Sequence, residues 1–224
     1  NFTLQLSLFD GVRQHCPQAR ILVVGRALEY QPQKRPLKET DPLGPVNPYG
    51  VSKVLQDVLG YAYARSYQLK IIRCRPFNHI GERQAPGFAI PDFSLQIAQI
   101  ENNSHLEPVI QVGNLDAIRD FTDVKDVVRA YSLLMSHGQV GQAYNIGSGQ
   151  GYTIKHMLNQ LLALSQRKIS IETDPQKFRP LDVAQVIADN SKIKQLGWEP
   201  QIKIQQTLQR VLNYYRENID QYIN

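Results

Sequence analysis

The chain has 224 residues, of which 42% are hydrophobic and 20% are charged, and its formal net charge at pH 7 is +5. This composition is ordinary for a globular protein with a substantial core, and it predicts one large domain, alone or with an added lobe. Because the positive charge is dispersed, the sequence favours a mildly basic surface over nucleic-acid binding, and the charge suits an anionic ligand such as a nucleotide.

The cysteines and the hydropathy of the sequence indicate the kind of compartment in which the protein works and whether it spans a membrane. Cys16 and Cys74 have neither the spacing of a metal site nor that of a disulfide, which is typical of reduced cysteines in a cytosolic protein. No apolar run approaches the roughly 18 residues of a membrane-spanning helix, and the chain shows no signal peptide and no initiator methionine. The sequence therefore predicts a cytoplasmic protein without a membrane span and, since no metal-ligand spacing occurs, without a metal site.

The first predicted element is a helix that begins at the first residue and ends before Pro17. Its apolar residues recur at helical spacing, so we expect one buried face formed by Leu4, Leu8, Phe9 and Val12. A chain that begins inside a helix predicts that an N-terminal part is missing.

A strand, a helix and a second strand follow. Residues 20–25 and 69–75 are short apolar runs of the kind buried in parallel sheets. Between them lie a loop rich in Pro, Lys and Gly over residues 31–46 and a helix over about residues 48–67. This order predicts a βαβ unit with a right-handed crossover, which binds ligands beyond the carboxyl ends of its strands. The expected core stripe of the helix is Val54, Leu55, Val58, Leu59 and Ala62.

The second half of the chain alternates shorter elements. The expected helices lie near residues 88–100, 123–134, 153–164, 191–196 and 204–222. The expected strands lie near residues 109–112, 119–121, 143–146, 169–172 and 186–188, and residues 178–182 are expected to form a loop.

Tyr49 and Lys53 stand at the start of the helix over residues 48–67, where Asn47 is a good N-cap. The spacing i, i+4 places the phenol and the ammonium on one helical face, one turn apart. A free tyrosine titrates near ~10, and a cation held beside a phenol favours its ionised form. The pair is a candidate acid–base device; the alternative for so short a motif is a packed tyrosine and a solvated lysine.

Several further motifs occur along the chain in a definite order. They are Asn47-Pro48-Tyr49 with Lys53, Arg75-Pro76-Phe77-Asn78-His79-Ile80-Gly81, Arg119-Asp120-Phe121, Tyr144-Asn145-Ile146-Gly147-Ser148-Gly149, Arg179-Pro180 with Asp182, and Leu196-Gly197-Trp198. In this order and spacing they resemble the extended short-chain dehydrogenases of the NAD-dependent epimerase/dehydratase family, which modify nucleotide sugars. The chain is most similar to the GDP-4-keto-6-deoxy-D-mannose reductase group, and GDP-mannose 4,6-dehydratase is the near relative.

The resemblance implies an α/β fold with a Rossmann-like, doubly wound parallel sheet that is incomplete at its N-terminus. Residues 1–80 would form the C-terminal part of the dinucleotide-binding domain. Residues 81–224 would form mainly a smaller α/β lobe that binds the nucleotide sugar, with short segments at about 113–150 returning to the first domain. The glycine-rich turn that cradles the dinucleotide in this family does not occur in the sequence. We therefore expect poor dinucleotide binding by these residues alone and an uncovered sheet edge.

The resemblance also implies hydride transfer between NADP or NAD and the C4 carbon of a sugar. Tyr49 would donate the proton to the C4 carbonyl oxygen, and Lys53 would favour the ionised phenol and contact the nicotinamide ribose. The residues expected to bind the cofactor are Tyr49, Lys53, Pro76, Phe77 and Asn78.

Positions after the first strand separate the subfamilies. Four residues before Tyr30 the family places a serine or threonine whose hydroxyl bonds the reacting oxygen, and here Arg26 takes that catalytic position. Arginine can donate hydrogen bonds, but it is much larger, and losing one donor to a reacting oxygen costs on the order of 10²–10³ in rate. A 4,6-dehydratase needs a carboxylate at the next-but-one position, where Leu28 stands, so a reductase is favoured. We expect the adjacent Glu29 to be a surface carboxylate or a capping group.

For the substrate, the resemblance implies a GDP-sugar. Guanidinium groups suit the diphosphate because their planar fork binds two phosphate oxygens. The alternative for Arg119 is an ion pair with Asp120 or Asp123, that for His79 is an ordinary loop histidine, and that for Asp182 is a capping role. The residues expected to bind the substrate are Asn78, His79, Arg119, Arg179 and Asp182.

Three functions stay open from the sequence. The first is a nucleotide-sugar reductase, the second a dehydratase or epimerase on the same scaffold, and the third a non-catalytic relative that binds a nucleotide sugar. The resemblance further implies a homodimer formed through the helix over residues 48–67. We expect Asp120, Asp123 and Asp126 to be caps and turn formers.

Overall fold

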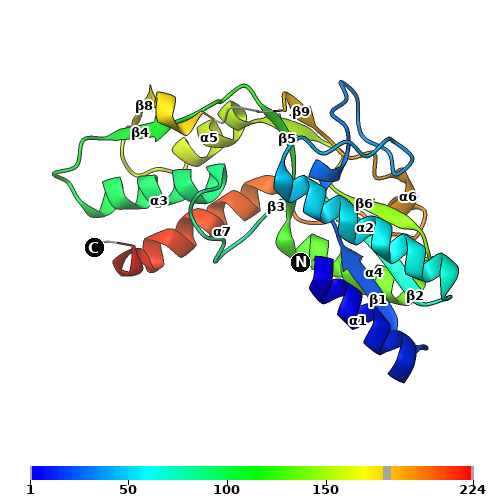
Figure 1. Ribbon diagram of the computed structural model, residues 1–224. Helices are drawn as coiled ribbons and strands as arrows, with labels where there is room; N and C mark the ends of the chain where they lie inside the picture. Colours follow the sequence, from blue (N-terminus) through cyan, green and yellow to red (C-terminus); the bar gives the residue numbers. More distant parts are fainter. Residues whose placement is uncertain (1, 179–182, 223–224) are drawn as a thin grey trace.

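A computed structural model describes residues 2–178 and 183–222 and shows an α/β architecture (Figure 1). The α-helices are α1 (Phe2–His15), α2 (Pro48–Ser66), α3 (Ala89–Asn102), α4 (Val124–His137), α5 (Ile154–Leu162), α6 (Ser191–Lys194) and α7 (Ile204–Glu217). The strands are β1 (Arg20–Val24), β2 (Lys70–Pro76), β3 (Asn78–Ile80), β4 (Val109–Val112), β5 (Ile118–Asp123), β6 (Ala143–Ile146), β7 (Gly151–Thr153), β8 (Ser170–Thr173) and β9 (Gln185–Val186). Short 3₁₀ helices are η1 (Ala27–Glu29), η2 (Pro175–Lys177) and η3 (Ile219–Gln221).

The first sheet consists, within the described residues, of β1, β2 and β6 in that order, all parallel. In the register of the sheet, Cys74 of β2 lies beside Val24 of β1 and Tyr144 of β6. The chain passes from β1 through α2 to the parallel strand β2, which confirms the predicted βαβ unit. Because β1 and β2 are parallel, their carboxyl ends lie at the same edge of the sheet.

Two apolar layers cover this sheet, because consecutive residues of a strand point to opposite faces. Ile71 belongs to a buried cluster with Phe9 of α1 and Tyr63 of α2. The next residue, Ile72, belongs to a different cluster with Ala130 of α4. The sheet is therefore packed between α1 and α2 on one face and α4 on the other.

Helices α3, α5 and α7 with strands β4 and β8 form a second group, drawn on the left of Figure 1, whereas α6 lies beside β6 of the first sheet. β5 pairs with β3, β7 and β9, and β4 pairs with β8. Helices α3, α5 and α7 pack around a buried cluster that includes Ile97, Met157 and Leu212. β5 connects the two groups, since α4 follows it directly and packs on the first sheet. A division of the chain into domains at residue 80 stays a prediction.

The apolar face expected for α1 is only partly buried. Phe9 is fully buried, whereas Leu4 is 76% exposed and Leu8 is 58% exposed. The prediction that Leu4 and Leu8 are core residues is wrong, because α1 packs mainly along one side of α2 through Phe9.

α2 turns a different face to the sheet from the one expected. Leu55 and Val58, predicted for the core, are each almost half exposed. Gly60 brings the helix close to β1, because a Cβ atom there would lie 3.2 Å from Cγ2 of Val23. Asp57 is drawn inward by arginines of β2. The residues that α2 buries are Gly50, Asp57, Gly60, Tyr63 and Ala64.

Within the described residues, none of the helices is long and apolar enough to cross a membrane. The same part of the chain contains no group of three or more His, Cys, Asp or Glu residues that could hold a metal ion.

Candidate active site

The Tyr49–Lys53 pair lies at the first turn of α2, beside the carboxyl end of β1. The Asn47 side chain caps the helix by accepting a hydrogen bond from the Gly50 backbone N–H at 2.8 Å. The Lys53 ammonium donates to the carbonyl oxygen of Val24, the last residue of β1, at 3.2 Å, and lies 6.0 Å from the centre of the Tyr49 ring. Tyr49 is 47% exposed, so its phenol is open to a ligand. The two side chains therefore share one face, as their spacing predicts.

Arg26 follows β1 and faces the same tyrosine. Its guanidinium carbon lies 5.4 Å from the centre of the Tyr49 ring, within the range of a cation–π contact. Its backbone N–H donates to the Glu29 carboxyl at 2.5 Å. The structure thus brings together Arg26, Tyr49 and Lys53, the three residues assigned to catalysis from the sequence.

A cavity of about 490 Å³ adjoins this group, and Arg26 forms part of its wall. Its volume is in the usual range for small-molecule sites. Asn78, His79 and Arg119 also line it, so three predicted substrate residues meet in one space. The apolar part of the wall is formed by Ile80, Phe88, Ile90, Phe93, Ala117, Phe121, Ile154 and Phe178.

β3 and β5 place the polar residues of this wall. The two strands are parallel, and Asn78 lies beside Phe121 in their register. His79 is exposed, and its Nδ1 lies 3.1 Å from the carbonyl oxygen of Phe77. Pro76 and Phe77, both predicted to bind the cofactor, are buried at the end of β2 and do not line the cavity.

The cavity is also lined by a charged residue, Lys177, that was not predicted from the sequence. Its ammonium lies 3.0 Å from both the Asp92 carboxylate and the Gln111 carbonyl oxygen. A Cβ atom at Gly113 would lie only 2.5 Å from the Lys177 carbonyl oxygen, so glycine allows the two segments to approach. Lys177 was not predicted because it belongs to none of the sequence motifs. The one signal that could have identified it is its position two residues before Arg179.

Two predicted residues, Arg179 and Asp182, lie outside the described part of the chain. Arg119 lies within it, and Nη1 of its guanidinium donates to the Ile118 carbonyl oxygen at 2.8 Å.

The aspartates that follow Arg119 stabilise the backbone. Asp123 caps α4 by accepting from the Lys125 N–H at 2.8 Å. Asp126 accepts from the backbone N–H groups of Gln201 and Ile202 at 3.0 and 2.9 Å. These contacts agree with the structural roles expected for both residues.

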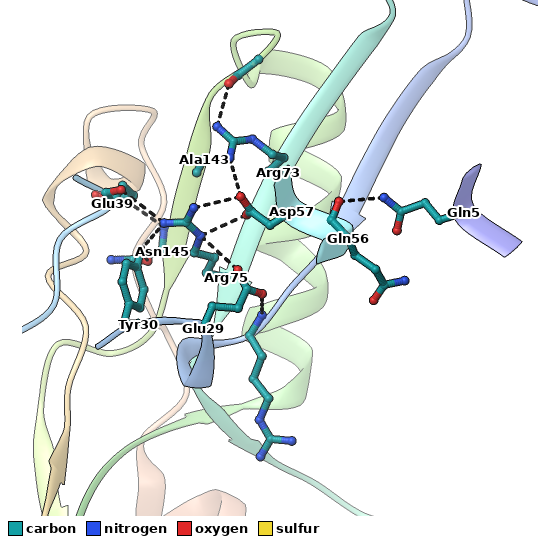
Figure 2. Close-up of polar contacts among 12 residues, drawn as sticks. Gln5, Glu29, Tyr30, Glu39, Gln56, Asp57, Arg73, Arg75, Ala143 and Asn145 are labelled. Atoms are coloured by element: carbon teal, nitrogen blue, oxygen red, sulfur yellow. Dashed lines mark hydrogen bonds and ion pairs between the residues drawn. The ribbon is translucent and has the colours of Figure 1, made fainter. Parts of the chain in front are cut away.

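A buried polar network connects β2 with α2 and with the turn after β1 (Figure 2). Its centre is Arg75, which bonds the Asp57 carboxylate through Nε and Nη2, at 3.0 Å each, and the Tyr30 hydroxyl through Nη1 at 2.9 Å. Nη1 of Arg73 donates to Oδ1 of Asp57 at 2.5 Å, and this oxygen also accepts from Nη2 of Arg75. Tyr30 donates to Asn145 at 2.7 Å, which connects β6 to the network.

Glu29 belongs to this network and not to the surface. It is fully buried, and its second carboxyl oxygen lies 3.4 Å from Nε of Arg75. Burial, together with the charge of Asp57, raises the pKa of the Glu29 carboxyl to about 8 against the opposing effect of Arg75. The expectation of a surface carboxylate was wrong, because the turn after β1 folds the side chain inward; the capping role is present, since Glu29 accepts from Arg26 at the start of η1.

Comparison with known protein families gives a match over most of the chain. The sequence profile of the family described as GDP-mannose 4,6 dehydratase matches residues 4–211. The chain belongs to the GDP-mannose 4,6 dehydratase family. This result confirms the resemblance to NAD-dependent epimerases and dehydratases and the Rossmann-like fold class.

Two curated relatives show how much of their own length the chain covers. GDP-6-deoxy-D-mannose reductase of Pseudomonas aeruginosa is 34% identical over 176 residues, which are 78% of this chain and 58% of the reductase. GDP-mannose 4,6-dehydratase of Vibrio cholerae is 29% identical over 203 residues, or 78% of this chain and 54% of the dehydratase. The chain therefore spans somewhat over half the length of these relatives.

A solved structure of RMD from Pseudomonas aeruginosa complexed with NADPH is similar in fold, with a TM-score of 0.89 and 29% sequence identity. The match covers 96% of this chain and 72% of that one.

Proposed function

We propose that the protein containing this chain is an NAD(P)-dependent nucleotide-sugar oxidoreductase that reduces the C4 ketone of GDP-4-keto-6-deoxy-D-mannose. One observation carries the proposal: Arg26 both faces the Tyr49 ring and lines the cavity. The acid–base pair and the polar wall formed by Asn78 and Arg119 are therefore parts of one site. The 34% identity to a GDP-6-deoxy-D-mannose reductase supports this choice of substrate.

The residues of the site have separate tasks in such a reduction. Tyr49 donates its hydroxyl proton to the C4 oxygen as that oxygen becomes an alcohol. Lys53, held by the Val24 carbonyl, stabilises the phenolate that is left. Arg26 donates hydrogen bonds to the C4 oxygen in place of the family's hydroxyl.

The substrate would occupy the cavity between β3, β5 and η2. Asn78 and His79 bind sugar hydroxyls, and Arg119 binds the diphosphate through its planar guanidinium. Lys177 adds a second cation on this wall, partly neutralised by Asp92. We assign Arg179 and Asp182 to the same substrate from their sequence positions alone.

The cofactor is proposed to be NADP or NAD, whose reduced form would supply the hydride for C4 when bound. The residues present fit its nicotinamide end, because Tyr49 and Val24 are both partly exposed at the carboxyl end of β1, where α/β sheets bind dinucleotides. Tyr49, Lys53 and Asn78 would contact it, and we retain Pro76 and Phe77 as the buried floor of its site.

A 4,6-dehydratase is disfavoured because Leu28 stands where such an enzyme requires a carboxylate. Leu28 carries no acid, and the neighbouring Glu29 is buried against Arg75 and does not line the cavity. No carboxylate of the turn after β1 is thus available to remove a sugar proton.

The test uses the intact protein with GDP-4-keto-6-deoxy-D-mannose and either NADPH or NADH. We expect loss of the reduced-nicotinamide absorbance with formation of the 4-hydroxy sugar. Turnover of GDP-mannose without added reductant would instead identify a dehydratase. Binding of the nucleotide sugar without turnover, with turnover gained in Arg26→Ser, would identify a non-catalytic relative.

We also propose that α2 forms a homodimer interface. Its outer face carries Val51, Leu55 and Val58, each almost half exposed. Leu4 and Leu8 of the adjacent α1 extend the apolar surface, and Figure 1 shows the two helices side by side. A second copy is the proposed occupant, because in a two-fold dimer this apolar face would meet its own equivalent.

A further inference from the structure

The turn between β1 and η1 is built around one buried carboxyl group. Oε1 of Glu29 accepts the Arg26 backbone N–H at 2.5 Å. A Cβ atom at Gly25 would lie 2.1 Å from this oxygen, so the carboxyl packs against the bare Cα of glycine. The Gly25 N–H in turn donates to the Cys74 carbonyl oxygen at 2.8 Å, which aligns the turn with β2. Glu29 thereby determines where the backbone leaves β1.

The same carboxyl group is connected to the helix that carries the acid–base pair. Oε2 of Glu29 lies 3.4 Å from Nε of Arg75, and Arg75 holds Asp57 by two hydrogen bonds (Figure 2). Asp57 lies one helical turn after Lys53 and two turns after Tyr49 on α2. The loop with Arg26 and the helix with Tyr49 are therefore held to the same arginine.

We propose that Glu29 is a positioning residue that holds the Arg26 guanidinium over the Tyr49 ring. Glu29 does not reach the cavity, so it acts through the backbone of Arg26. The catalytic consequence of this inference rests on the proposed function, whereas the positioning itself does not.

Several charged and titratable groups surround the Glu29 carboxyl. They are Asp57 and Lys53 of α2, Arg75 and the Cys74 thiol of β2, and the Tyr30 phenol. Burial and Asp57 raise the pKa of Glu29 to about 8, and Arg75, the Arg26 N–H and Lys53 oppose the rise. Glu29 should therefore titrate within an experimentally accessible range.

The first test is an NMR titration of the intact protein from about pH 6 to about pH 10, on either side of that pKa. A hydrogen bond to a carboxylate is stronger than one to a neutral carboxyl. We therefore expect the Arg26 amide resonance to move with a midpoint near 8, and to lose this movement in Glu29→Gln. The Asn145 amide, which donates to Glu39 at 2.8 Å, is the matched control and should not follow this midpoint.

An Arg26 amide that does not move, or that moves equally in Glu29→Gln, would overturn the positioning role. The wild-type titration needs no variant, so it decides the question even if Glu29→Gln fails to fold. It also remains informative if the intact protein shows no reductase activity.

The second test is a double-mutant cycle on the reduction rate. Small misplacements of catalytic groups cost up to about 100-fold, and we expect Glu29→Ala, which removes the acceptor of the Arg26 N–H, to lower kcat by about 10- to 100-fold with little change in KM. In an Arg26→Ala background the same change should cost nothing further, because the residue through which Glu29 acts is gone. Equal losses in both backgrounds would show a merely structural role. Glu39→Ala, which removes another carboxylate that accepts a backbone N–H, should leave kcat unchanged.

Discussion

Arg75 of β2 holds the Asp57 carboxylate of α2 in a two-pronged hydrogen bond, with Nε and Nη2 each 3.0 Å from an oxygen. Both side chains are almost completely buried. This contact fixes the rotation of α2 on the sheet, and with it the direction in which Tyr49 and Lys53 point.

Removing one partner of this buried pair should be strongly destabilising. Arg75→Ala leaves the Asp57 charge with Arg73 as its remaining cationic partner among the described residues, and we expect a loss of roughly 3–5 kcal/mol in the free energy of unfolding. Arg13→Ala is the matched control, since Arg13 pairs with Asp10 at 3.8 Å on the surface and should cost less than ~1 kcal/mol. Urea unfolding measures both, and equal losses would contradict the assignment.

Asp120 organises the turn after β6, and Asp120→Asn should disrupt it. The carboxylate accepts from the N–H and hydroxyl of Ser148 and from the N–H groups of Gly149 and Ala188. The NH₂ group of asparagine would face some of these N–H and O–H donors, with which it cannot form a hydrogen bond. We therefore expect a loss of roughly 2–3 kcal/mol in the free energy of unfolding. Asp174→Asn, at the N-cap of η2, should change stability by no more than about 1 kcal/mol. Thermal or urea unfolding of the two variants provides the comparison.

Tyr49→Phe should abolish the proton donor without altering the fold. We expect kcat for the 4-keto sugar to fall by about 10²–10⁴, with the melting temperature preserved because the ring is exposed. Tyr61→Phe removes the same atom from an equally exposed tyrosine of α2 and should retain activity. Similar activity in both variants would remove Tyr49 from the mechanism.

Glu29 should make stability depend on pH. Its pKa rises from the ordinary 4.5 to about 8 on folding, so between these values the folded state keeps a proton that the unfolded state has lost. This contribution to stability is present in full below about pH 4.5 and is lost as the pH rises through 8, with a slope of up to about 1.4 kcal/mol per pH unit. Glutamine does not titrate, so Glu29→Gln should flatten the curve. Urea unfolding at several pH values would detect the difference, and parallel curves would refute it.

The α2 face should control the oligomeric state. Val58→Glu places a charge in the proposed apolar interface, and we expect light scattering to show a monomer in place of a dimer. Val128→Glu introduces the same charge at a similarly exposed valine on α4 and should leave the dimer intact. A monomeric wild-type protein, or dissociation by both variants, would reject the α2 interface.

Much of the fold and of the site could be predicted locally. The β-branched runs of β1 and β2 and the Asn47 cap of α2 depend on neighbours in the chain, and the structure has them where they were expected. β3 and β7 were missed, because three-residue strands have too few residues for a period and form only by pairing with β5. Lys177 was missed for a similar reason, since it reaches the cavity only through the packing of η2 against β4.

The amino-acid sequence by itself determined the βαβ unit, the family and the i, i+4 spacing that places Tyr49 and Lys53 on one face. Only the tertiary structure decided which face of α2 is buried, because helical periodicity cannot distinguish an apolar stripe that meets the sheet from one left on the surface. It also decided that Glu29 is internal. The burial of the Glu29 carboxyl depends on Arg75, which compensates part of the desolvation cost. Arg75 is far from Glu29 in the sequence, and only the folded chain brings the two side chains together.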